Sequence, residues 1–508
     1  MRRFLLLAAA LCSSCVIKTL DVQPVDVADG APISIQSPVK AHLLDGSTVV
    51  FEKGVTVAEG EVRGDGRKYD LTLDTSVRVS SVPVDDVAAM ESYQTPVHAA
   101  GTAAASTATT AGIVVGSVVL IKAIFGSCPT IYTIDGQQAE LQAESFSYSI
   151  APAYEARDVD RLSLIPIGGR ITLELRNEAL ETHYINQLEL LELSHSPGET
   201  VFPDENGRPI AVSSPRAPIS AMDSSGRDVG RMRARADGEA WSTPDERLRR
   251  VSREDFEDHI DLVFKVAESA TEAALILRLR NSLLNTVLLY DVMLKNQGFK
   301  ALDWMGRDIN RFPDKLKLGY WYKTRMGMRI AVWDRGRYRD VGRVGDTGPI
   351  AWDEVAVRIP VPEPGLLRVR LSFVADNWRV DRVAAATGVR ELEPRVVALS
   401  NVMNPDDTAL DSAVPYLKKA DDAYLITKPG DRLMLHFDVG AAADNSEHTY
   451  FLAATGYYME WMRRDWLVNT TAPAFEPSDD ALLAALSLWE SRREDFRAQF
   501  ESTRIPVR

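Results

Sequence analysis

The sequence predicts a mainly β protein with a small N-terminal antiparallel barrel, an apolar helix, and a large β-sandwich-like region that includes a few helices, one of them C-terminal. Short runs that alternate apolar and polar residues predict half-buried strands, and Asp-Gly pairs predict tight turns between them. Apolar residues at helical spacing occur in only three later segments. At 508 residues the chain is long enough for about three domains.

The first 14 residues have the features of a secretory signal peptide. Arg2 and Arg3 form a positively charged start, and the apolar run over residues 4–11 is too short to span a bilayer. Small residues follow this run, as they do before a cleavage site. We therefore expect residues 1–14 to be removed on export.

The stretch Leu11-Cys12-Ser13-Ser14-Cys15 resembles the lipobox of bacterial envelope lipoproteins. Ser14 suits the position before the cleaved bond, whereas Cys12 stands where a lipobox usually has Leu. The resemblance implies a lipid anchor on Cys15, and stable anchoring takes more than one acyl chain, which a lipoprotein's modified cysteine supplies. The alternative is ordinary secretion with cleavage after a small residue.

Cysteine count and charge are consistent with an exported protein. The chain has three cysteines, and Cys128 is the only thiol left if Cys15 is lipidated, so the mature fold must rest on its core without an internal disulfide. The net charge of −14 becomes −16 without Arg2 and Arg3 (−14 − 2), which argues against nucleic-acid binding. We expect a membrane-anchored protein of the cell envelope that faces the periplasm or lies in the outer membrane.

The N-terminal part is predicted to contain a tether and a small barrel. Residues 15–34 show no sustained period and read as a lipidated tether. Residues 35–94 contain short alternating runs with Asp-Gly turns, among them 48–51, 55–57, 69–73 and 77–84. With its DGS turn at 45–47 and its VPVDDV segment at 82–87, this stretch resembles the SH3-like or Sm-like small barrels. That resemblance implies a fold and no function, because such barrels serve many functions.

A long segment without charged residues follows the predicted barrel, between His98 and Lys122. Residues 99–126 are expected to form an apolar helix long enough to cross a bilayer. Gly112 and Gly116 form a GxxxG pair, which lets helices pack closely. The alternatives are a helix buried within the protein, against a partner, or in a homo-oligomer.

The rest of the chain is predicted to be rich in strands and is divided into a β-rich domain over 127–270 and a β-sandwich-like domain with helices over 271–508. Alternating patterns predict strands at 130–134, 170–175, 188–193, 275–279, 328–333, 355–359 and 366–374. Helical spacing appears at 283–304, at Tyr458, Met462 and Trp466, and over 478–500, where Ser478 is a suitable N-cap.

No catalytic or metal-binding motif stands out, and no cofactor is expected. The seven histidines form no HxH or HExxH pair, and there is no phosphate-binding glycine loop. The acidic run at 254–261 lacks the spacing of a calcium loop and reads as a solvated charged turn or helix start. Nothing near Cys128 in sequence would activate its thiol, so we expect a small buried residue.

The most distinctive local feature is a stretch over 315–343 that is basic and aromatic in an acidic chain. Aromatic faces can stack on sugar rings, and arginine grips carboxylates and phosphates with two hydrogen bonds. The candidate binding residues are Tyr320, Trp321, Arg325, Arg329, Trp333 and Arg337. The competing interpretation is a strand pair that turns its aromatic residues inward and its arginines to solvent.

These features favour a non-enzymatic envelope lipoprotein that binds a glycan or a protein partner. One alternative is a hydrolase of envelope polymers whose carboxylates converge only in the folded protein. Another is a structural or assembly component that oligomerises through the apolar helix.

Overall fold

The computed structural model describes residues 21–24, 32–36, 39–45, 47–69, 76–94, 128–135, 138–230, 236–440, 446–463, 466 and 475–502. Cys15, the signal peptide and the apolar segment 99–126 with Gly112 and Gly116 lie outside these residues and stay predictions. Of the residues that the structure describes, 49% lie in strands and 18% in helices, which confirms a mainly β protein built from several antiparallel sheets. The helices in the described ranges include none that is both long and apolar enough to cross a bilayer.

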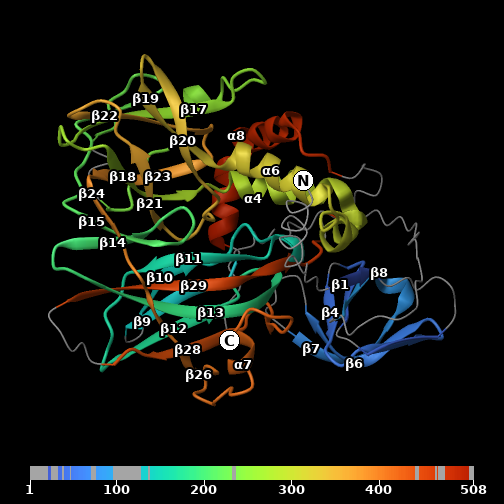
Figure 1. The fold of residues 1–508 in the computed structure, drawn as a ribbon. Coiled ribbons are helices and arrows are strands. Elements are labelled where there is room, and N and C mark those ends of the chain that lie inside the picture. Colours follow the sequence, from blue (N-terminus) through green and yellow to red (C-terminus); the bar gives the residue numbers. More distant parts are fainter. Residues whose placement is uncertain are drawn as a thin grey trace, which may run out of the picture.

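The N-terminal part forms one antiparallel sheet of eight strands around its own apolar cluster, drawn in blue in Figure 1. Its elements are β1 (Asp21–Pro24), β2 (Ile33–Ile35), β3 (Val39–Leu43), β4 (Thr48–Phe51), β5 (Val55–Ala58), β6 (Glu61–Tyr69), β7 (Ser76–Pro83), the short helix η1 (Val84–Asp86) and β8 (Val87–Gln94). β1 pairs with β8 and β2 pairs with β5, so the predicted tether over 15–34 contributes two edge strands instead of remaining irregular.

Residues 128–460 form five further sheets, numbered I to V here. Sheet I has the order β10 (Gln138–Glu144), β9 (Thr130–Asp135), β12 (Arg170–Arg176), β28 (Arg432–Asp438), β26 (Leu399–Met403). Sheet II has the order β11 (Ala156–Leu162), β29 (Glu447–Glu460), β13 (Glu181–His195), β25 (Arg395–Val397), with β27 (Leu425–Thr427) also on β13. Sheet III has the order β14 (Glu199–Pro203), β15 (Pro209–Ser213), β24 (Gly388–Glu391). Sheet IV has the order β21 (Asp353–Pro360), β18 (Glu272–Asn281), β23 (Trp378–Ala386). Sheet V has the order β16 (Ser220–Asp223), β17 (Glu257–Lys265), β22 (Leu366–Val374), β19 (Met328–Asp334), β20 (Arg337–Val344).

The five sheets are stacked as layers, from sheet I at the bottom of Figure 1 to sheet V at the top. Sheets I and II enclose one apolar core, and sheets IV and V enclose another. Sheet III lies between the two sandwiches, with Val201 and Ala211 against sheet II and Phe202 and Ile210 against sheet IV. Alternate residues of one strand face opposite sides of its sheet, so each strand of sheet III can serve both neighbours.

The structure groups the strands differently from the predicted division at 270–271. β17 and β18 lie on either side of that boundary, yet their side chains share the core between sheets IV and V. The first sandwich is built from residues 130–195 and 395–460, so the second sandwich interrupts it in sequence. Spatial pairing of strands far apart in sequence decides this arrangement, and local periodicity carries no information on it.

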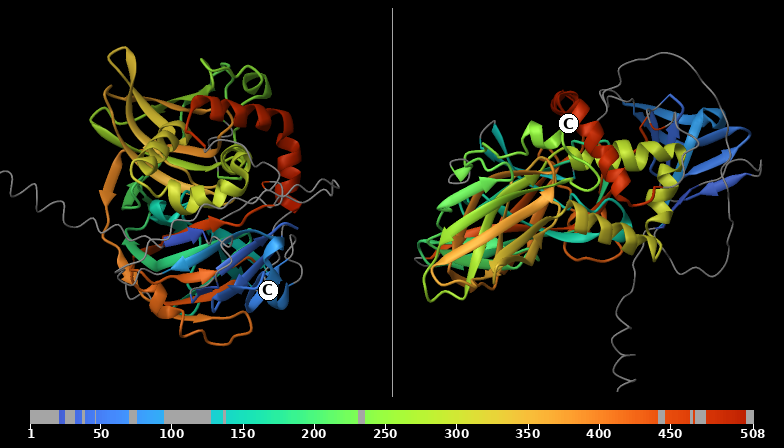
Figure 2. Two further views of the ribbon diagram at one scale, coloured as in Figure 1. Left: turned by 90° about the vertical axis from the view of Figure 1, so that its right-hand side faces the viewer. Right: turned by 90° about the horizontal axis from the view of Figure 1, so that it is seen from above.

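A layer of helices covers one end of both sandwiches (Figures 1 and 2). Its elements are α3 (Asp245–Leu248), α4 (Leu284–Val287), η3 (Leu288–Leu294), η4 (Lys295–Lys300), α5 (Ala301–Asp303), η5 (Trp304–Asp308), α6 (Asp314–Met326) and α8 (Asp479–Ser502). The short helix η2 (Pro152–Tyr154) contacts this layer, since Tyr154 Oη donates to the Lys315 carbonyl at 2.9 Å, whereas α7 (Val414–Leu417) packs on β13 and β26. The predicted helix at 478–500 is confirmed, and the Ala481 amide donates to the Ser478 hydroxyl at 3.3 Å. The segment 283–304 is helical as predicted, but as a series of short turns from α4 to η5 that is broken at Gly298, whose φ of 56° and ψ of −130° are not helical.

Two sequence interpretations need correction. Tyr458 lies in strand β29, although its spacing to Met462 and Trp466 suggested a helix. β29 pairs with both β11 and β13 and is buried on both faces, which hides the period of two that marks a half-exposed strand. The acidic run at 254–261 is mostly strand β17, and its Asp258 is fully buried, where it accepts a hydrogen bond from Thr243 Oγ1 at 2.7 Å.

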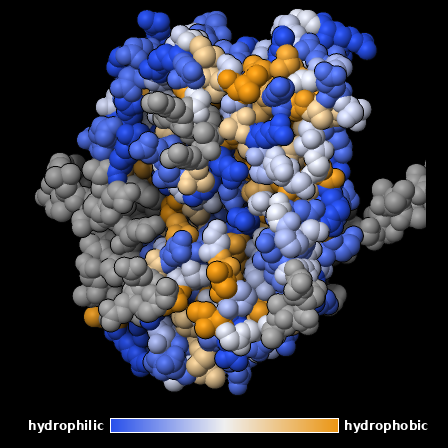
Figure 3. Space-filling view, turned by 90° about the vertical axis from the view of Figure 1, so that its left-hand side faces the viewer, coloured by the Kyte–Doolittle hydropathy of each residue, from blue (hydrophilic) through white to orange (hydrophobic). Residues whose placement is uncertain are grey.

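The surface opposite the helices has an ordinary mixed character. On the face shown in Figure 3, apolar side chains form several separate patches among hydrophilic ones. Scattered apolar patches of this kind are normal on soluble domains, so this face suggests no particular partner.

Candidate functional site

A cavity of about 450 Å³ lies where the two sandwiches, sheet III and the helical layer meet. Its walls come from the end of β10 with the segment that follows, β11, the loop 203–207, η3, α6 and the segment 343–353. Small-molecule sites are typically clefts of about 300–1,000 Å³ at such junctions between structural units. This cavity is therefore the candidate functional site.

Carboxyl groups and phenols dominate the polar lining. The carboxyl groups belong to Glu144, Asp158, Asp204, Glu205, Asp346 and Asp353, and the phenols to Tyr148, Tyr154, Tyr290, Tyr322 and Tyr458. Arg157, Lys323 and Arg343 add positive charge. The lining thus offers hydrogen-bond acceptors, donors and aromatic faces to one ligand.

Glu144 ends strand β10 and is only 2% exposed. Its Oε2 atom accepts hydrogen bonds from the amides of Ile350 at 2.7 Å and Ala351 at 3.2 Å, whereas Oε1 has no hydrogen-bond partner among the described residues. Burial raises the pKa of Glu144 to about 8, so the carboxyl group is largely protonated at neutral pH. Within the described part of the chain, the Oε1 atom is therefore a buried acceptor without a partner, close behind the cavity wall.

Gly348 allows the carboxyl group of Glu144 to come this close to the 343–353 segment. It has a φ of +76°, and a Cβ atom placed on it would lie 2.5 Å from Glu144 Cδ. Glycine is the residue that adopts this left-handed conformation without strain and leaves the space free.

Asp158 and Asp353 approach the cavity from β11 of the first sandwich and β21 of the second. Asp158 accepts hydrogen bonds from the amides of Phe146 at 2.8 Å and Val159 at 3.0 Å. Burial raises the pKa of Asp158 to about 6 and that of Asp353 to about 7, and the negative charge of Asp158 adds to the shift at Asp353. Two carboxyl groups with raised, unequal pKa values at a cavity are typical of functional sites.

Asp346 is held at the cavity by two short contacts. Tyr322 Oη on α6 donates to Asp346 Oδ2 at 2.5 Å, and the Gly348 amide donates to Oδ1 at 3.1 Å. Burial raises the pKa of Asp346, and the hydrogen bond from Tyr322 opposes that rise. Tyr322 therefore links the helical layer to the carboxyl-rich wall.

A second group of buried charges lies behind the cavity. Tyr290 borders the cavity and donates to Glu460 at 2.5 Å, and Arg463 pairs with the same carboxylate at 2.9 Å. Glu181 Oε1 and His183 Nε2 lie 2.7 Å apart and share a hydrogen bond. Burial raises the pKa of both Glu181 and Glu460 to about 8. These groups hold the end of sheet II against η3.

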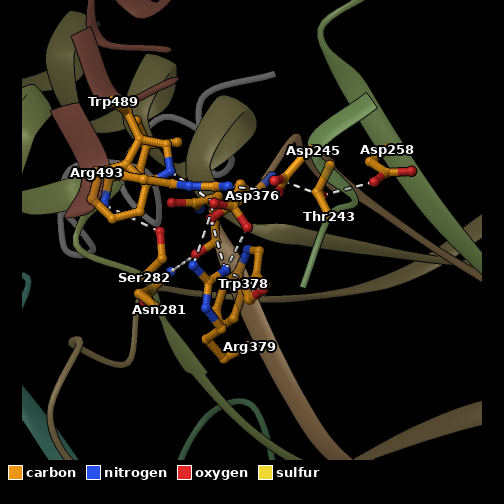
Figure 4. Close-up of polar contacts among 12 residues, drawn as sticks. Thr243, Asp245, Asp258, Asn281, Ser282, Asp376, Trp378, Arg379, Trp489 and Arg493 are labelled. Carbon is orange, nitrogen blue, oxygen red and sulfur yellow. Dashed lines mark hydrogen bonds and ion pairs between the residues drawn. The ribbon is translucent and has the colours of Figure 1, made fainter. Parts of the chain in front are cut away.

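A polar network anchors the C-terminal helix on the second sandwich (Figure 4). Trp489 Nε1 on α8 donates to Asp376 Oδ2 at 2.8 Å, and Arg379 Nη1 donates to Oδ1 at 2.7 Å. The Asp376 amide donates to Thr243 Oγ1 at 2.8 Å. Asp376 is fully buried and has a φ of 59°. Its amide and both of its carboxylate oxygens have hydrogen-bond partners, so we regard this network as structural.

The residues predicted to form a binding patch fall into two groups. Tyr320, Trp321 and Arg325 lie on helix α6, while Arg329 and Trp333 on β19 and Arg337 on β20 belong to a hairpin of sheet V. The stretch is thus a helix followed by a hairpin, which differs from the strand pair considered as its alternative.

Several of these side chains are already engaged. Trp321 packs into the helical core, with its ring 6.2 Å from that of Phe475. Arg325 donates to Asp479 at 2.8 Å, and Arg329 donates to Glu257 at 2.8 Å. Trp333 packs edge-on against Tyr338 at 5.1 Å, whereas Tyr320 and Arg337 are exposed.

Sequence reasoning missed the carboxyl groups of the cavity because they are far apart along the chain. One local signal was present: Asp158 and Asp160 alternate with Val159 on β11 and therefore point to the same face of a strand. Cys128 also borders the cavity, is 2% exposed as expected of a small buried residue, and has its thiol pKa raised well above the usual value by burial. Across the described ranges, no group of three or more His, Cys, Asp or Glu side chains is placed to hold a metal ion.

Comparison with known proteins identifies no family. No protein-family model matches the chain, and no curated protein matches it. Among solved structures, a cycloalternan-forming enzyme from Listeria monocytogenes with a pentasaccharide substrate is 10% identical with a TM-score of 0.17, and the match covers 72% of this chain and 30% of that one. An exo-β-1,3-galactanase from Phanerochaete chrysosporium is 9% identical with a TM-score of 0.17 and covers 70% and 82%. A structure of the infectious bursal disease virus Gt strain is 10% identical with a TM-score of 0.12 and covers 74% and 88%. TM-scores this low carry no argument about fold or function, so the site rests on its own geometry.

Proposed function

We propose that this chain is an envelope lipoprotein, anchored through Cys15, that binds a glycan in the cavity between its two sandwiches. The observation that carries the proposal is the cavity lining, which combines phenol rings, buried carboxyl groups and cationic side chains around about 450 Å³. The N-terminal sheet, which we infer to be a small barrel of the SH3-like kind, would stand between the anchor and this binding unit.

The chemistry of the lining suits a saccharide. Sugar hydroxyls donate to carboxylates and accept from arginine and lysine, and hydrogen bonds to charged partners are the stronger kind. The C–H faces of a sugar ring can pack on phenol rings such as those of Tyr148 and Tyr154, which are half-buried at the cavity wall.

Replacing Tyr322 by Phe is expected to weaken glycan binding roughly tenfold, because the hydroxyl that positions Asp346 at the cavity is lost. Titration calorimetry with peptidoglycan fragments and anionic envelope oligosaccharides would measure the affinity. Tyr320→Phe is the matched control, since Tyr320 lies two residues away on the same helix and is 75% exposed. Failure of every oligosaccharide to bind the unaltered protein would refute the proposal.

A second candidate function is hydrolysis of the bound glycan. The observation that favours it is the pair formed by Asp158, with a pKa of about 6, and Asp353, with a pKa of about 7. A general acid must be protonated and a general base ionised, and pKa values near the working pH suit both roles.

In that case turnover is expected to peak between about pH 6 and 7, where Asp158 is ionised and Asp353 still carries its proton. Asp353→Asn should abolish the release of reducing ends from the same oligosaccharides, whereas Asp411→Asn, at an exposed loop position, should leave it unchanged. Binding without any release of reducing ends would leave glycan binding as the function and exclude hydrolysis.

A further inference from the structure

Helix α6 presents an apolar stripe to solvent beside the face that borders the cavity. Phe312 just before the helix and Leu316 and Tyr320 within it are spaced four residues apart and are 74%, 54% and 75% exposed. Leu318 and Tyr322 of the same helix border the cavity instead. Large apolar side chains at helical spacing that stay exposed usually mark a contact surface.

The same segment carries the opposite charge to the rest of the protein. Residues 307–326 contain six Lys and Arg against two Asp, a net charge of +4 (6 − 2), in a chain of net charge −14. The cationic residues are Arg307, Arg311, Lys315, Lys317, Lys323 and Arg325. Most of these charges are offset within the protein, since Arg307 pairs with Asp303 and Asp308, Arg311 with Asp308, Lys317 with Glu476 and Arg325 with Asp479. The positive charge that remains unpaired among the described residues of this corner comes from Lys315 and Lys323.

The N-terminal end of the described chain lies at this corner. Strand β1, which begins at Asp21, packs beside η5, the helical turn that leads into Phe312 and α6. Figures 1 and 2 show the blue N-terminal sheet next to the yellow helices. Cys15 precedes Asp21 by six residues, which can span at most about 20 Å. A lipid on Cys15 would therefore hold this corner close to the bilayer.

We propose that the surface formed by Phe312, Leu316, Tyr320 and the surrounding Lys and Arg side chains, named the α6 face here, docks on an anionic phospholipid surface. Apolar side chains on one side of such a helix enter the headgroup region, and the cationic ones attract anionic headgroups. Lys323 also borders the glycan cavity, whereas Phe312, Leu316 and Tyr320 do not. The proposal therefore rests on the lipid anchor inferred at Cys15 and does not depend on the nature of the cavity ligand. It orients the molecule with α6 at the bilayer.

The test places an environment-sensitive fluorophore on Leu316→Cys in the full chain, with Cys12 and Cys15 replaced by Ser so that no acyl group contributes. Vesicles of phosphatidylcholine with phosphatidylglycerol are expected to shift the emission to the blue, and phosphatidylcholine alone to cause a much smaller shift. Ile167→Cys is the matched control, because Ile167 is also apolar and 79% exposed but lies in the loop between β11 and β12. The label at 167 should not respond.

Two variants separate the apolar and the electrostatic contributions. Phe312→Ser with Tyr320→Ser should reduce the blue shift at 316, and Arg311→Glu with Lys315→Glu should remove its dependence on phosphatidylglycerol. No shift at 316 with anionic vesicles, or an equal shift at 167, would overturn the proposal. So would a concentration-dependent shift without vesicles, since that would mean that a second copy of the chain covers the α6 face. Glycan titration on the same samples reports separately on the cavity.

Discussion

Replacing Trp489 by Ala is expected to lower the free energy of unfolding by about 3–5 kcal/mol, the usual cost of removing a large buried aromatic side chain. Trp489 is 1% exposed and joins the helical core that α8 shares with α4 and η3. Its loss would leave a cavity and would also remove the hydrogen bond to Asp376 (Figure 4). The buried carboxylate would then lose one of its donors, which adds to the cost.

Two matched variants separate these effects in chemical denaturation. Trp489→Phe keeps most of the ring volume but cannot donate to Asp376, so it should cost about 1–3 kcal/mol. Arg493→Ala removes the ion pairs of Arg493 with Asp245 and Glu494, whose carboxylates are exposed, and should cost at most about 1 kcal/mol. A Trp489→Ala protein as stable as the Arg493→Ala protein would show that α8 does not stabilise the second sandwich.

The stability of the ligand-free protein is expected to fall as the pH rises from about 5 to 8. Burial raises the pKa of Glu144, Glu181 and Glu460 to about 8, well above the ordinary value of 4.5. Between the ordinary pKa and the raised pKa, these three groups keep their protons in the folded protein and have lost them in the unfolded chain. The free energy of unfolding therefore falls as the pH rises through this range. This contribution is fully present below about pH 4.5 and is lost as the pH passes the folded-state pKa.

Glu144→Gln should remove one part of this dependence. At pH 5 the carboxyl group is protonated in the folded protein and Gln is a close mimic, so the two proteins should be similarly stable. At pH 9 the variant should be the more stable, by an amount on the order of a few kcal/mol, because it avoids burying a charge. Thermal unfolding across this pH range measures the difference, with the exposed Glu239→Gln as a control. If the stability of Glu144→Gln and that of the unaltered protein changed with pH in the same way, the raised pKa that burial gives Glu144 would be contradicted.

Local pattern predicted individual strands well. The alternation at 170–175 and 366–374 corresponds to β12 and β22, and each strand places its alternate residues in a sandwich core. The pattern failed where both faces of a strand are buried, as around Tyr458 in β29. Successive residues of such a strand are apolar, so the alternation that marks a half-buried strand is absent. It also failed to show that β1 and β2 complete the N-terminal sheet, since edge strands of three and four residues have little periodicity to detect.

The candidate site was beyond sequence reasoning for a different reason. Glu144, Asp158, Asp346 and Asp353 come from three stretches of a long chain, and only the contact between the two sandwiches brings them to one cavity. Their raised pKa values arise from burial, which is a property of the folded state. The basic and aromatic stretch over 315–343 was visible in the sequence, but its division between α6 and the β19–β20 hairpin was not.

By itself the sequence determined that the chain is mainly β, that a C-terminal helix begins after Ser478, and that positive charge gathers around α6, because these follow from local periodicity, capping and composition. The tertiary structure alone decided that one sandwich interrupts the other, that sheet III joins them as a middle layer, and that carboxyl groups line the resulting cavity. These features depend on pairing between distant strands and on burial, and neither quantity is encoded in any short stretch of the chain.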